Sequence, residues 1–324
     1  MPYELPPMRP PSEARSLLIR VMRGCPWNYC TFCSAYKDLP RKAMMRSVEE
    51  VKGDIDEVRA ACEDARSRAC LSGRQGYVVQ PKTAFLADSN AIIIKGADLA
   101  EIVVHLLEAF PSLERVTSYG RAKTVLVKDP GELRDLRRAG LNRLHLGLES
   151  GDDGVLQRVR KGATSEQMIA AGLKVKEAGF ELSEYVMPGL GGRDASERHV
   201  EGTARVLNAV DPDYTRVRSL ILAPGTPLFE EYEAGEFQAL SRLETVREIR
   251  ALVERLEITG RLCFDHFSNP PFLRQDWEGY KFPEEKEAVL ASIDSVLERW
   301  QARLSEGEAD ASGEGTGPAI GTHL

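Results

Sequence analysis

The sequence predicts an α/β fold built around a parallel β-sheet. Short apolar segments alternate with amphipathic helical segments, and polar or glycine-rich residues follow several of the apolar segments. An open doubly wound sheet and a barrel both satisfy this alternation. The predicted strands comprise residues 17–21, 83–87, 115–118, 143–148, 181–187 and 215–222.

Capping signals predict where the helices between these strands begin. Ser47 and Glu50 have the spacing of a capping box, and apolar residues recur after them at steps of three and four. Asp129 followed by Pro130 is typical of a first helical turn. Five helices are expected between the strands, starting near residues 47, 98, 129, 164 and 194.

After the sixth strand the pattern becomes mostly helical. Ser241 opens a further capping box, a short strand is expected at 262–264, and a charged helix at about 283–304. The predicted domains are an N-terminal arm (1–16), a core domain (17–230), a mostly helical C-terminal extension (231–304) and a disordered acidic, glycine-containing tail (305–324).

The composition is that of an ordinary globular protein. The 324 residues are 42% hydrophobic and 29% charged. No run of about 18 apolar residues is present, and the first residues lack a secretory pattern, so we expect no membrane span and a cytoplasmic location. The net charge of −7 argues against nucleic acid as the main partner.

Three cysteines lie close together after the first predicted strand. Cys25, Cys30 and Cys33 have the spacing C-x4-C-x2-C. Soft thiolate ligands favour Zn, Cu(I) or an iron–sulfur cluster. A closed zinc site needs four protein ligands, and the next candidates, Cys62 and His105, are far along the chain. Three ligands on a four-iron cluster would leave one iron open, which suggests chemistry rather than structure.

The cysteine spacing alone leaves other functions open. One alternative is a zinc-stabilised binding protein on a barrel scaffold, with a fourth ligand from elsewhere in the chain. A second is an iron–sulfur electron carrier, although such a carrier normally has a fourth cysteine. Reduced thiols without a metal are the third alternative.

The cysteine segment resembles the cluster loop of the radical S-adenosylmethionine (SAM) enzymes. That family usually has the spacing C-x3-C-x2-C, so this chain has one extra residue, and Phe32 matches the aromatic before the last cysteine. Residues 147–151, Gly-Leu-Glu-Ser-Gly, are similar to a second motif of the family, and the stretch that continues from Asp152 to Thr164 is similar to one subgroup of it. Over residues 17–230, the resemblance implies a partial (β/α)6 barrel, with the helical extension after it.

The resemblance also implies the chemistry. Cys25, Cys30 and Cys33 are expected to hold a 4Fe–4S cluster, and SAM to bind its open iron. Cleavage of SAM with one electron from reduced flavodoxin or ferredoxin would give a 5′-deoxyadenosyl radical, which abstracts hydrogen from an unidentified substrate. Glu149 is expected to contact SAM, whose ribose and ammonium are donors; its alternative role is a carboxylate beside a helix N-terminus.

Further strand-end residues have weaker support as cofactor-binding residues. Asp88 stands where the family often has Gly-Gly-Glu, although this sequence lacks the glycines, and an Asx turn is the alternative. Ser118 and Arg121 follow the third predicted strand, where relatives contact SAM or substrate; a surface arginine is the alternative. Gly189 lies in a glycine-rich turn that allows close approach to a ligand.

The remaining cysteines and two histidines are not expected to bind metal. Cys62, Cys70 and Cys263 are too scattered for a second cluster, and Cys62 is expected to be a small buried side chain. His145 alternates with apolar neighbours and is expected to point into the barrel. His266 follows a short strand and is a possible residue at the open end of the barrel.

Overall fold

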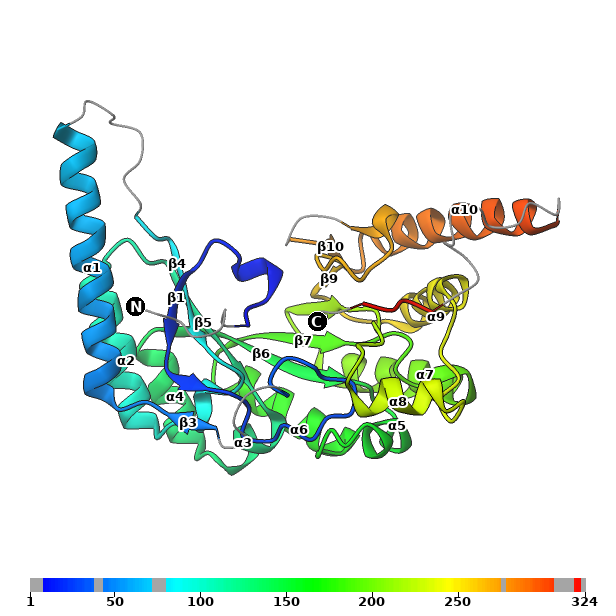
Figure 1. Cartoon of the computed structure of the whole chain (residues 1–324), viewed down its shortest axis with the longest axis horizontal. Coiled ribbons are helices and arrows are strands. Elements are labelled where there is room, and N and C mark those ends of the chain that lie inside the picture. Colours follow the sequence, from blue (N-terminus) through cyan, green and yellow to red (C-terminus); the bar gives the residue numbers. More distant parts are fainter. Residues whose placement is uncertain (1–7, 38–42, 72–79, 275–277, 306–317, 322–324) are drawn as a thin grey trace. The chain divides into compact units, whose positions relative to one another are not determined.

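The computed structural model describes residues 8–37, 43–71, 80–274, 278–305 and 318–321, with only the backbone for 66–71 and 303–305. The main sheet has eight strands in the open order β1-β4-β5-β6-β7-β8-β9-β10 (Figure 1). Neighbouring strands run parallel in the β1–β4, β4–β5, β7–β8 and β8–β9 pairs, and β10 runs antiparallel to β9. The predicted mostly parallel α/β fold is therefore confirmed. The strands are β1 (Leu17–Arg20), β4 (Thr83–Ala87), β5 (Arg115–Gly120), β6 (Leu141–Glu149), β7 (Glu181–Val186), β8 (Tyr214–Val217), β9 (Arg261–Cys263) and β10 (Tyr280–Lys281).

The chain divides into two compact units. The first unit comprises residues 1–26, 39–145 and 174–181, and the second unit comprises 27–38, 146–173 and 182–324. The chain passes from the first to the second unit within β6 and again at the start of β7, so the division falls inside the predicted core domain. Each unit is described by itself below.

The first unit holds strands β1, β4 and β5 and the helices that follow them. Helix α1 packs against α2, and α2 packs against α4 (Figure 1). The predicted capping box is present, since the Ser47 N–H donates to Glu50 Oε2 (2.8 Å) and the Glu50 N–H donates to Ser47 Oγ (3.2 Å). A small two-stranded antiparallel sheet that we did not predict precedes α1. The elements are β2 (Met22–Arg23), β3 (Met44–Met45), α1 (Val48–Leu71), α2 (Gly96–Ala109), α3 (Ala122–Val127) and α4 (Pro130–Arg138).

The second unit holds β7, β8, β9 and β10, with helices between and after them. Helix α9 packs against both α7 and α10. The predicted capping box at Ser241 and Glu244 is present at the start of α9. Helix α6 (Ser165–Glu177) begins in this unit and ends in the first. The other helices are α5 (Asp153–Arg158), α7 (Gly192–Val210), α8 (Pro227–Glu233), α9 (Arg242–Arg255) and α10 (Lys286–Ser305).

Two predicted strands end more than one residue away from the predicted position. Strand β8 ends at Val217 rather than at 222, because the backbone beyond it has other partners: Ser219 N–H donates to the Asn269 side chain (3.1 Å) and Leu220 N–H to Pro188 O (2.8 Å). Strand β5 continues to Gly120, so Ser118 lies inside the strand rather than after it.

Most of the tail that we predicted to be disordered lies outside the described residues. Residues 318–321 are described, and Ile320 forms a parallel bridge with Leu222. The predicted disorder therefore does not extend to these four residues.

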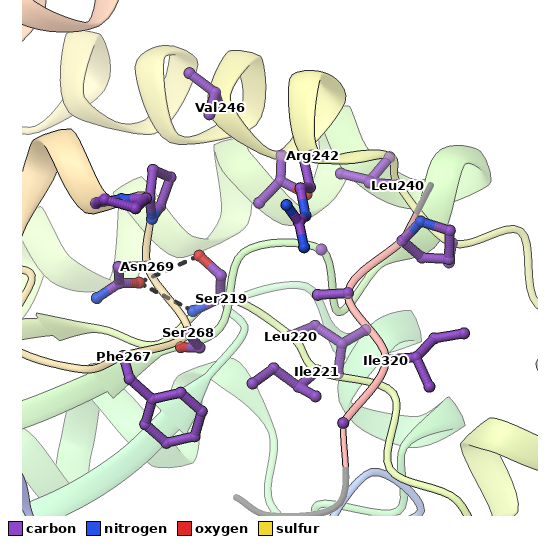
Figure 2. Close-up of a pocket in the computed structure, with 18 of the residues that line it drawn as sticks. Ser219, Leu220, Ile221, Leu240, Arg242, Val246, Phe267, Ser268, Asn269 and Ile320 are labelled. Carbon is purple, nitrogen blue, oxygen red and sulfur yellow. Dashed lines mark hydrogen bonds between the residues drawn. The ribbon is translucent and has the colours of Figure 1, made fainter. Parts of the chain in front are cut away.

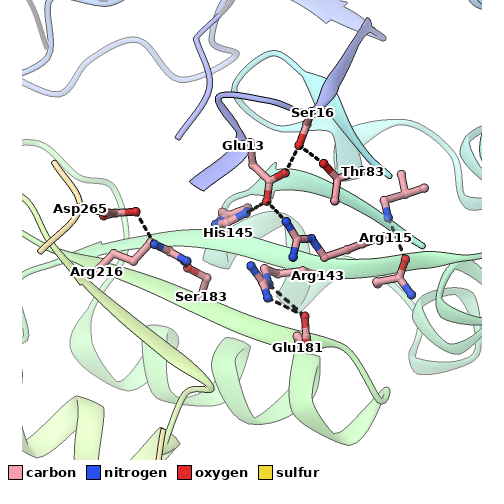
Figure 3. Close-up of polar contacts among 12 residues, drawn as sticks. Glu13, Ser16, Thr83, Arg115, Arg143, His145, Glu181, Ser183, Arg216 and Asp265 are labelled. Atoms are coloured by element: carbon pink, nitrogen blue, oxygen red, sulfur yellow. Dashed lines mark hydrogen bonds and ion pairs between the residues drawn. The ribbon is translucent and has the colours of Figure 1, made fainter. Parts of the chain in front are cut away.

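The N-terminal segment places a buried acid in the first unit. Glu13 ends a short 3₁₀ helix (Pro11–Glu13) and is fully buried. Its carboxylate accepts a hydrogen bond from Ser16 (2.5 Å) and lies 3.4 Å from Arg115 Nη2 and 3.6 Å from His145 Nε2 (Figure 3). Burial alone would raise the pKa of Glu13, but His145, Arg115 and Ser16 together lower it to about 2.

We expect Glu13→Gln to destabilise the protein at pH 7. The pKa of Glu13 falls from its ordinary 4.5 to about 2 in the folded state, which corresponds to about 3 kcal/mol of stability above pH 4.5. This contribution is lost as the pH falls through the folded pKa. Urea unfolding at several pH values should therefore show that the difference in the free energy of unfolding between wild type and variant becomes smaller as the pH falls from 4.5 to 2. Glu114→Gln, at an exposed ion pair with Lys82, is the control. A difference in the free energy of unfolding that does not change with pH would contradict the lowered pKa of Glu13.

Candidate functional site

In the first unit, two side chains hold the start of the cysteine loop. Gly24 N–H donates to Asp88 Oδ2 (3.3 Å), and Ser89 Oγ donates to Gly24 O (2.8 Å). Both polar groups of the residue before Cys25 are thus bound by the turn after β4. Asp88 is buried, which raises the pKa of its carboxyl, while Arg20 at 3.7 Å opposes that effect.

The same turn is connected to the end of β5. Asn90 Oδ1 accepts from Arg121 N–H (3.1 Å), and Asn90 Nδ2 donates to Thr124 Oγ1 (2.9 Å). Ser118 is fully buried, and its hydroxyl has no hydrogen-bond partner among the described residues. The sequence after β4 lacks the family's glycines, and its side chains bind the neighbouring backbone instead. Asp88, Ser118 and Arg121 remain predictions as cofactor-binding residues.

In the second unit, the rest of the cysteine loop is bound to the stretch that follows β6. Trp27 Nε1 donates to Arg160 O (2.7 Å), and Thr31 N–H donates to Val159 O (3.1 Å). Gly162 lies against the Trp27 ring with φ +79°, and a Cβ there would be 2.4 Å from the ring. The two segments that carried the family resemblance therefore meet directly.

Glu149 stands at the end of β6 in a left-handed conformation, with φ +63°. Its Oε1 accepts from Lys161 Nζ at 2.8 Å, and both side chains are largely buried. Glu184 of β7 is buried near this pair. Burial raises the pKa of Glu184 well above its ordinary value, Lys161 opposes the shift and Glu149 adds to it. Glu184 Oε2 has no hydrogen-bond partner among the described residues.

Sequence reasoning missed Lys161 and Glu184. A signal for Lys161 was available, because it lies in the same stretch as Glu149 and twelve residues after it. No comparable signal marked Glu184, whose neighbours in β7 are mixed in polarity.

Phe32 packs in a buried apolar cluster of the second unit. Val159, Met187 and Leu222 belong to the same cluster, and Cys30 and Cys33 pack against it. The aromatic ring therefore fixes the middle of the loop between two thiols. Whether Phe32 also contacts a cofactor remains a prediction.

The three cysteine thiols have the chemistry that an iron–sulfur cluster needs. Cys25, Cys30 and Cys33 are partly buried. Cys25 belongs to the first unit and the other two to the second. Over the described ranges, no group of three or more His, Cys, Asp or Glu side chains is arranged around a metal position. The donor set fits the cluster by its chemistry and spacing, and the ligand assignment rests on these.

Comparisons with known proteins identify the family. Residues 87–207 match the model of the radical SAM superfamily, a stretch that begins after the cysteine loop and includes Glu149. Over this stretch the chain matches the radical SAM superfamily, the family that its motifs resemble. Radical SAM proteins use a 4Fe–4S cluster and SAM, which confirms the predicted class of cofactors.

The chain spans only part of the length of its relatives in sequence. The chain is 26% identical over 120 residues to a tRNA uridine(34) acetyltransferase of Methanocaldococcus jannaschii, covering 36% of this chain and 22% of that protein. It is 25% identical over 266 residues to a tRNA-2-methylthio-N(6)-dimethylallyladenosine synthase of Thiobacillus denitrificans, covering 77% and 52%. Both relatives are named for reactions on tRNA, whereas the charge of this chain led us to expect another substrate.

Solved radical SAM structures share the fold. Coproporphyrinogen III oxidase from Escherichia coli aligns with a TM-score of 0.50 at 16% identity, covering 75% of this chain and 54% of that one. A maturase of the [FeFe]-hydrogenase aligns with a TM-score of 0.51 at 13% identity, covering 86% and 54%. In the part of the chain that is described, no helix is long and apolar enough to span a membrane.

A second buried network links two strand ends in the second unit. Gly189 N–H donates to Glu248 Oε1 (2.6 Å), and Ser196 Oγ donates to Glu248 Oε2. His199 lies between Ser150 and Glu248. Its Nδ1 is 2.8 Å from Ser150 Oγ, and its Nε2 is 3.7 Å from Glu248 Oε1. Gly189 has φ +89°, which a residue with a side chain rarely adopts.

Burial controls the protonation of this network. It raises the pKa of Glu248 to about 7, against the hydrogen bonds from Ser196 and Gly189. It lowers the pKa of His199 to about 4, against the charge of Asp152. The network therefore joins the residue after Glu149 to the glycine turn through groups that are neutral near pH 6.

Other buried polar residues have structural partners. Arg216 is fully buried in the second unit, with Nε donating to Ser183 Oγ (3.1 Å) and an ion pair to Asp265 (Figure 3). His266 Nδ1 lies 2.8 Å from Ser268 Oγ, and burial with Arg218 and Arg274 lowers the pKa of His266 to about 3. His145 packs against the rings of Phe85 and Tyr119 in the first unit. Of the scattered cysteines, Cys263 is buried, and the Cys70 side chain lies outside the described residues. The expected burial of Cys62 was wrong, because this side chain on α1 is only half-buried.

We expect Gly162→Ala to disturb the cysteine loop. The new methyl group would meet the Trp27 ring, and the positive φ would cost about 1–3 kcal/mol. Iron and sulfide content after anaerobic reconstitution should fall by about half or more. Gly53→Ala on α1 is the control, because nothing lies within 4 Å of its added Cβ. Full iron content in the Gly162 variant would show that the loop does not depend on this contact.

We expect Glu248→Gln to become relatively more stable as the pH rises. The folded-state pKa of Glu248, about 7, exceeds its ordinary 4.5. Between pH 4.5 and 7 the carboxyl therefore ionises in the unfolded chain while it stays protonated in the folded protein, and the wild type loses about 3 kcal/mol of stability. Glutamine keeps an acceptor for Gly189 and does not ionise. Denaturant unfolding at pH 4.5, 6 and 8 measures the difference. Glu254→Gln, an exposed site on α9, is the control. A difference in the free energy of unfolding between wild type and Glu248→Gln that does not change with pH would refute the raised pKa of Glu248.

Proposed function

We propose that this chain is a radical SAM enzyme that acts on an as yet unidentified substrate. Cys25, Cys30 and Cys33 would hold the 4Fe–4S cluster, and Glu149 would contact SAM. When bound, the cluster and SAM supply reductive cleavage to a 5′-deoxyadenosyl radical that abstracts hydrogen from the substrate. Family membership supports this class of reaction.

The observation that carries the proposal is the direct contact between the two family motifs. The cysteine loop binds the stretch after Glu149 through two hydrogen bonds, at Trp27 and Thr31, and through the close approach of Gly162. A zinc-stabilised binding protein or a simple electron carrier has no need for a carboxylate motif held against its thiolate loop. Contact between the motifs is expected of a site that binds SAM beside the cluster.

The protein's own groups would orient the cofactors and exclude water. Lys161 holds one oxygen of Glu149 and so restrains the carboxylate, which would accept hydrogen bonds from the donors of SAM. Asp88 and Ser89 fix the backbone before Cys25. Phe32 and its apolar neighbours shield one side of the loop from water.

The partners follow from the reaction class. Cleavage of SAM requires one electron, for which a reduced flavodoxin or ferredoxin in the cytoplasm is the proposed donor. The acidic balance of the chain supports a substrate other than nucleic acid. Because the chain spans 22% and 52% of the two relatives described above, their substrates are not transferred to it.

We expect Cys30→Ala to abolish both cluster assembly and SAM cleavage. The reconstituted protein should release 5′-deoxyadenosine from SAM with dithionite, detected by mass spectrometry, and the variant should release none, because its cluster lacks a ligand. Cys62→Ala, at a half-buried site on α1, should keep both properties. A Cys30 variant that retains iron, sulfide and cleavage would exclude the ligand assignment.

We expect Glu149→Ala to keep the cluster and to weaken SAM binding. Loss of a charge-assisted hydrogen bond should lower the affinity about tenfold. Equilibrium dialysis with labelled SAM measures this, and the iron content shows that the cluster is intact. Glu166→Ala, at an exposed ion pair with Arg205, is the control. Unchanged SAM affinity would return Glu149 to a structural role.

A further inference from the structure

A cavity of about 700 Å³ lies within the second unit. Its walls come from the segment after β8, the start of α9, residues 267–274, the last turns of α10 and residues 318–321 (Figure 2). This volume falls in the range of small-molecule sites. Neither the three cysteines nor Glu149 lines it.

Much of the wall is apolar. Leu220, Ile221 and Val246 line it, with the rings of Phe267 and Trp300. Phe267 and Ile320 leave 55% and 54% of their surfaces exposed, although both are large apolar residues. Exposed apolar surface that gathers around a cavity indicates that an apolar group binds there.

The charged groups at the cavity have one sign. Arg242, Arg274 and Arg299 line it, and none of its lining residues is Asp or Glu, although the whole chain has 50 acidic and 43 basic residues. Arg274 Nε donates to Asn269 O (3.0 Å), and Arg299 Nη1 donates to Ser295 Oγ (2.9 Å). Among the described residues, none of the three guanidinium groups forms an ion pair. The cavity therefore has positive charge available for an anion.

Arg242 is the most informative of the three. It occupies the first position of α9, where the helix dipole disfavours a cation. Ser241 and Glu244 already cap this helix end. Figure 2 shows the Arg242 side chain extending from the helix toward the Ser219–Ile221 segment. An anionic ligand would explain a cation at this unfavourable position.

Hydrogen bonds of Asn269 order one wall of the cavity before any ligand binds. Asn269 is buried, and its Oδ1 accepts from Ser219 N–H (3.1 Å) and Ser219 Oγ (3.2 Å), while its Nδ2 donates to Val217 O (2.7 Å) (Figure 2). These bonds fix residues 267–274 to the end of β8. A ligand would thus meet an ordered wall, which lowers the entropic cost of binding.

We propose that this cavity binds an amphipathic anion, a carboxylate or phosphate monoester on an apolar body. Arg242 and Arg299 would bind the anionic group through charge-assisted hydrogen bonds. The apolar body would lie along Leu220, Ile221 and Phe267. The site does not depend on the proposed radical chemistry, although Gly189 also lies at its edge.

Calorimetric titration of the full reconstituted chain tests the proposal. Octyl phosphate and octanoate are the probes, and 1-octanol and octylamine are matched ligands without the negative charge. At least one anion should bind, the neutral and cationic ligands should bind about tenfold more weakly or not at all, and Arg242→Gln should weaken anion binding about tenfold. Binding of one anion alone supports the site and identifies the headgroup.

The matched control is Arg247→Gln, at an exposed arginine of the same helix that lines a separate groove beside α7. It should leave anion binding unchanged, and circular dichroism should show that both variants are folded. Arg299→Gln is the second test of the charge requirement. Equal binding of 1-octanol, no anion binding, or no effect of either variant at the cavity would overturn the proposal. Displacement of the bound anion by SAM would also overturn it, because the cavity would then belong to the cofactor site.

Discussion

The attachment of the cysteine loop to the stretch after β6 is the interaction on which the candidate site depends. Trp27 and Thr31 use two hydrogen bonds to bind consecutive backbone carbonyls at 159 and 160. The stretch can accept the loop this closely only because Gly162 has no side chain. A loop with three thiols has little regular structure of its own, so its position comes from these contacts. The same stretch supplies Lys161, which orients Glu149.

Buried carboxylates bind the backbone of two further turns near the candidate site residues. Asp88 binds the backbone before Cys25, and Glu248 binds the backbone of Gly189. In both cases an acid satisfies an N–H group in a turn that a ligand-binding site needs to keep rigid. Such groups are costly to bury, and their raised pKa values reflect that cost. The site is therefore stabilised by polar contacts whose strength depends on pH.

Local signals in the sequence predicted much of the fold. The capping boxes at Ser47 and Ser241 and the alternating strands follow from contacts within a few residues, which the sequence displays directly. The end of β8 was missed because Ser219 bonds to Asn269, fifty residues away. The burial of Glu13 was missed for the same reason, since His145 and Arg115 are distant in sequence. At the site, the cysteines and Glu149 were found by motif, whereas Glu184 and Glu248 act through long-range contacts.

Electron paramagnetic resonance of the dithionite-reduced protein, before and after SAM is added, tests the central claim most directly. The account predicts the signal of a reduced 4Fe–4S cluster that changes when SAM is added, because the three thiolates proposed as ligands would leave one iron open to bind SAM. A cluster signal that SAM leaves unchanged would indicate an electron carrier. The absence of a cluster signal, with zinc in the protein, would contradict the account altogether.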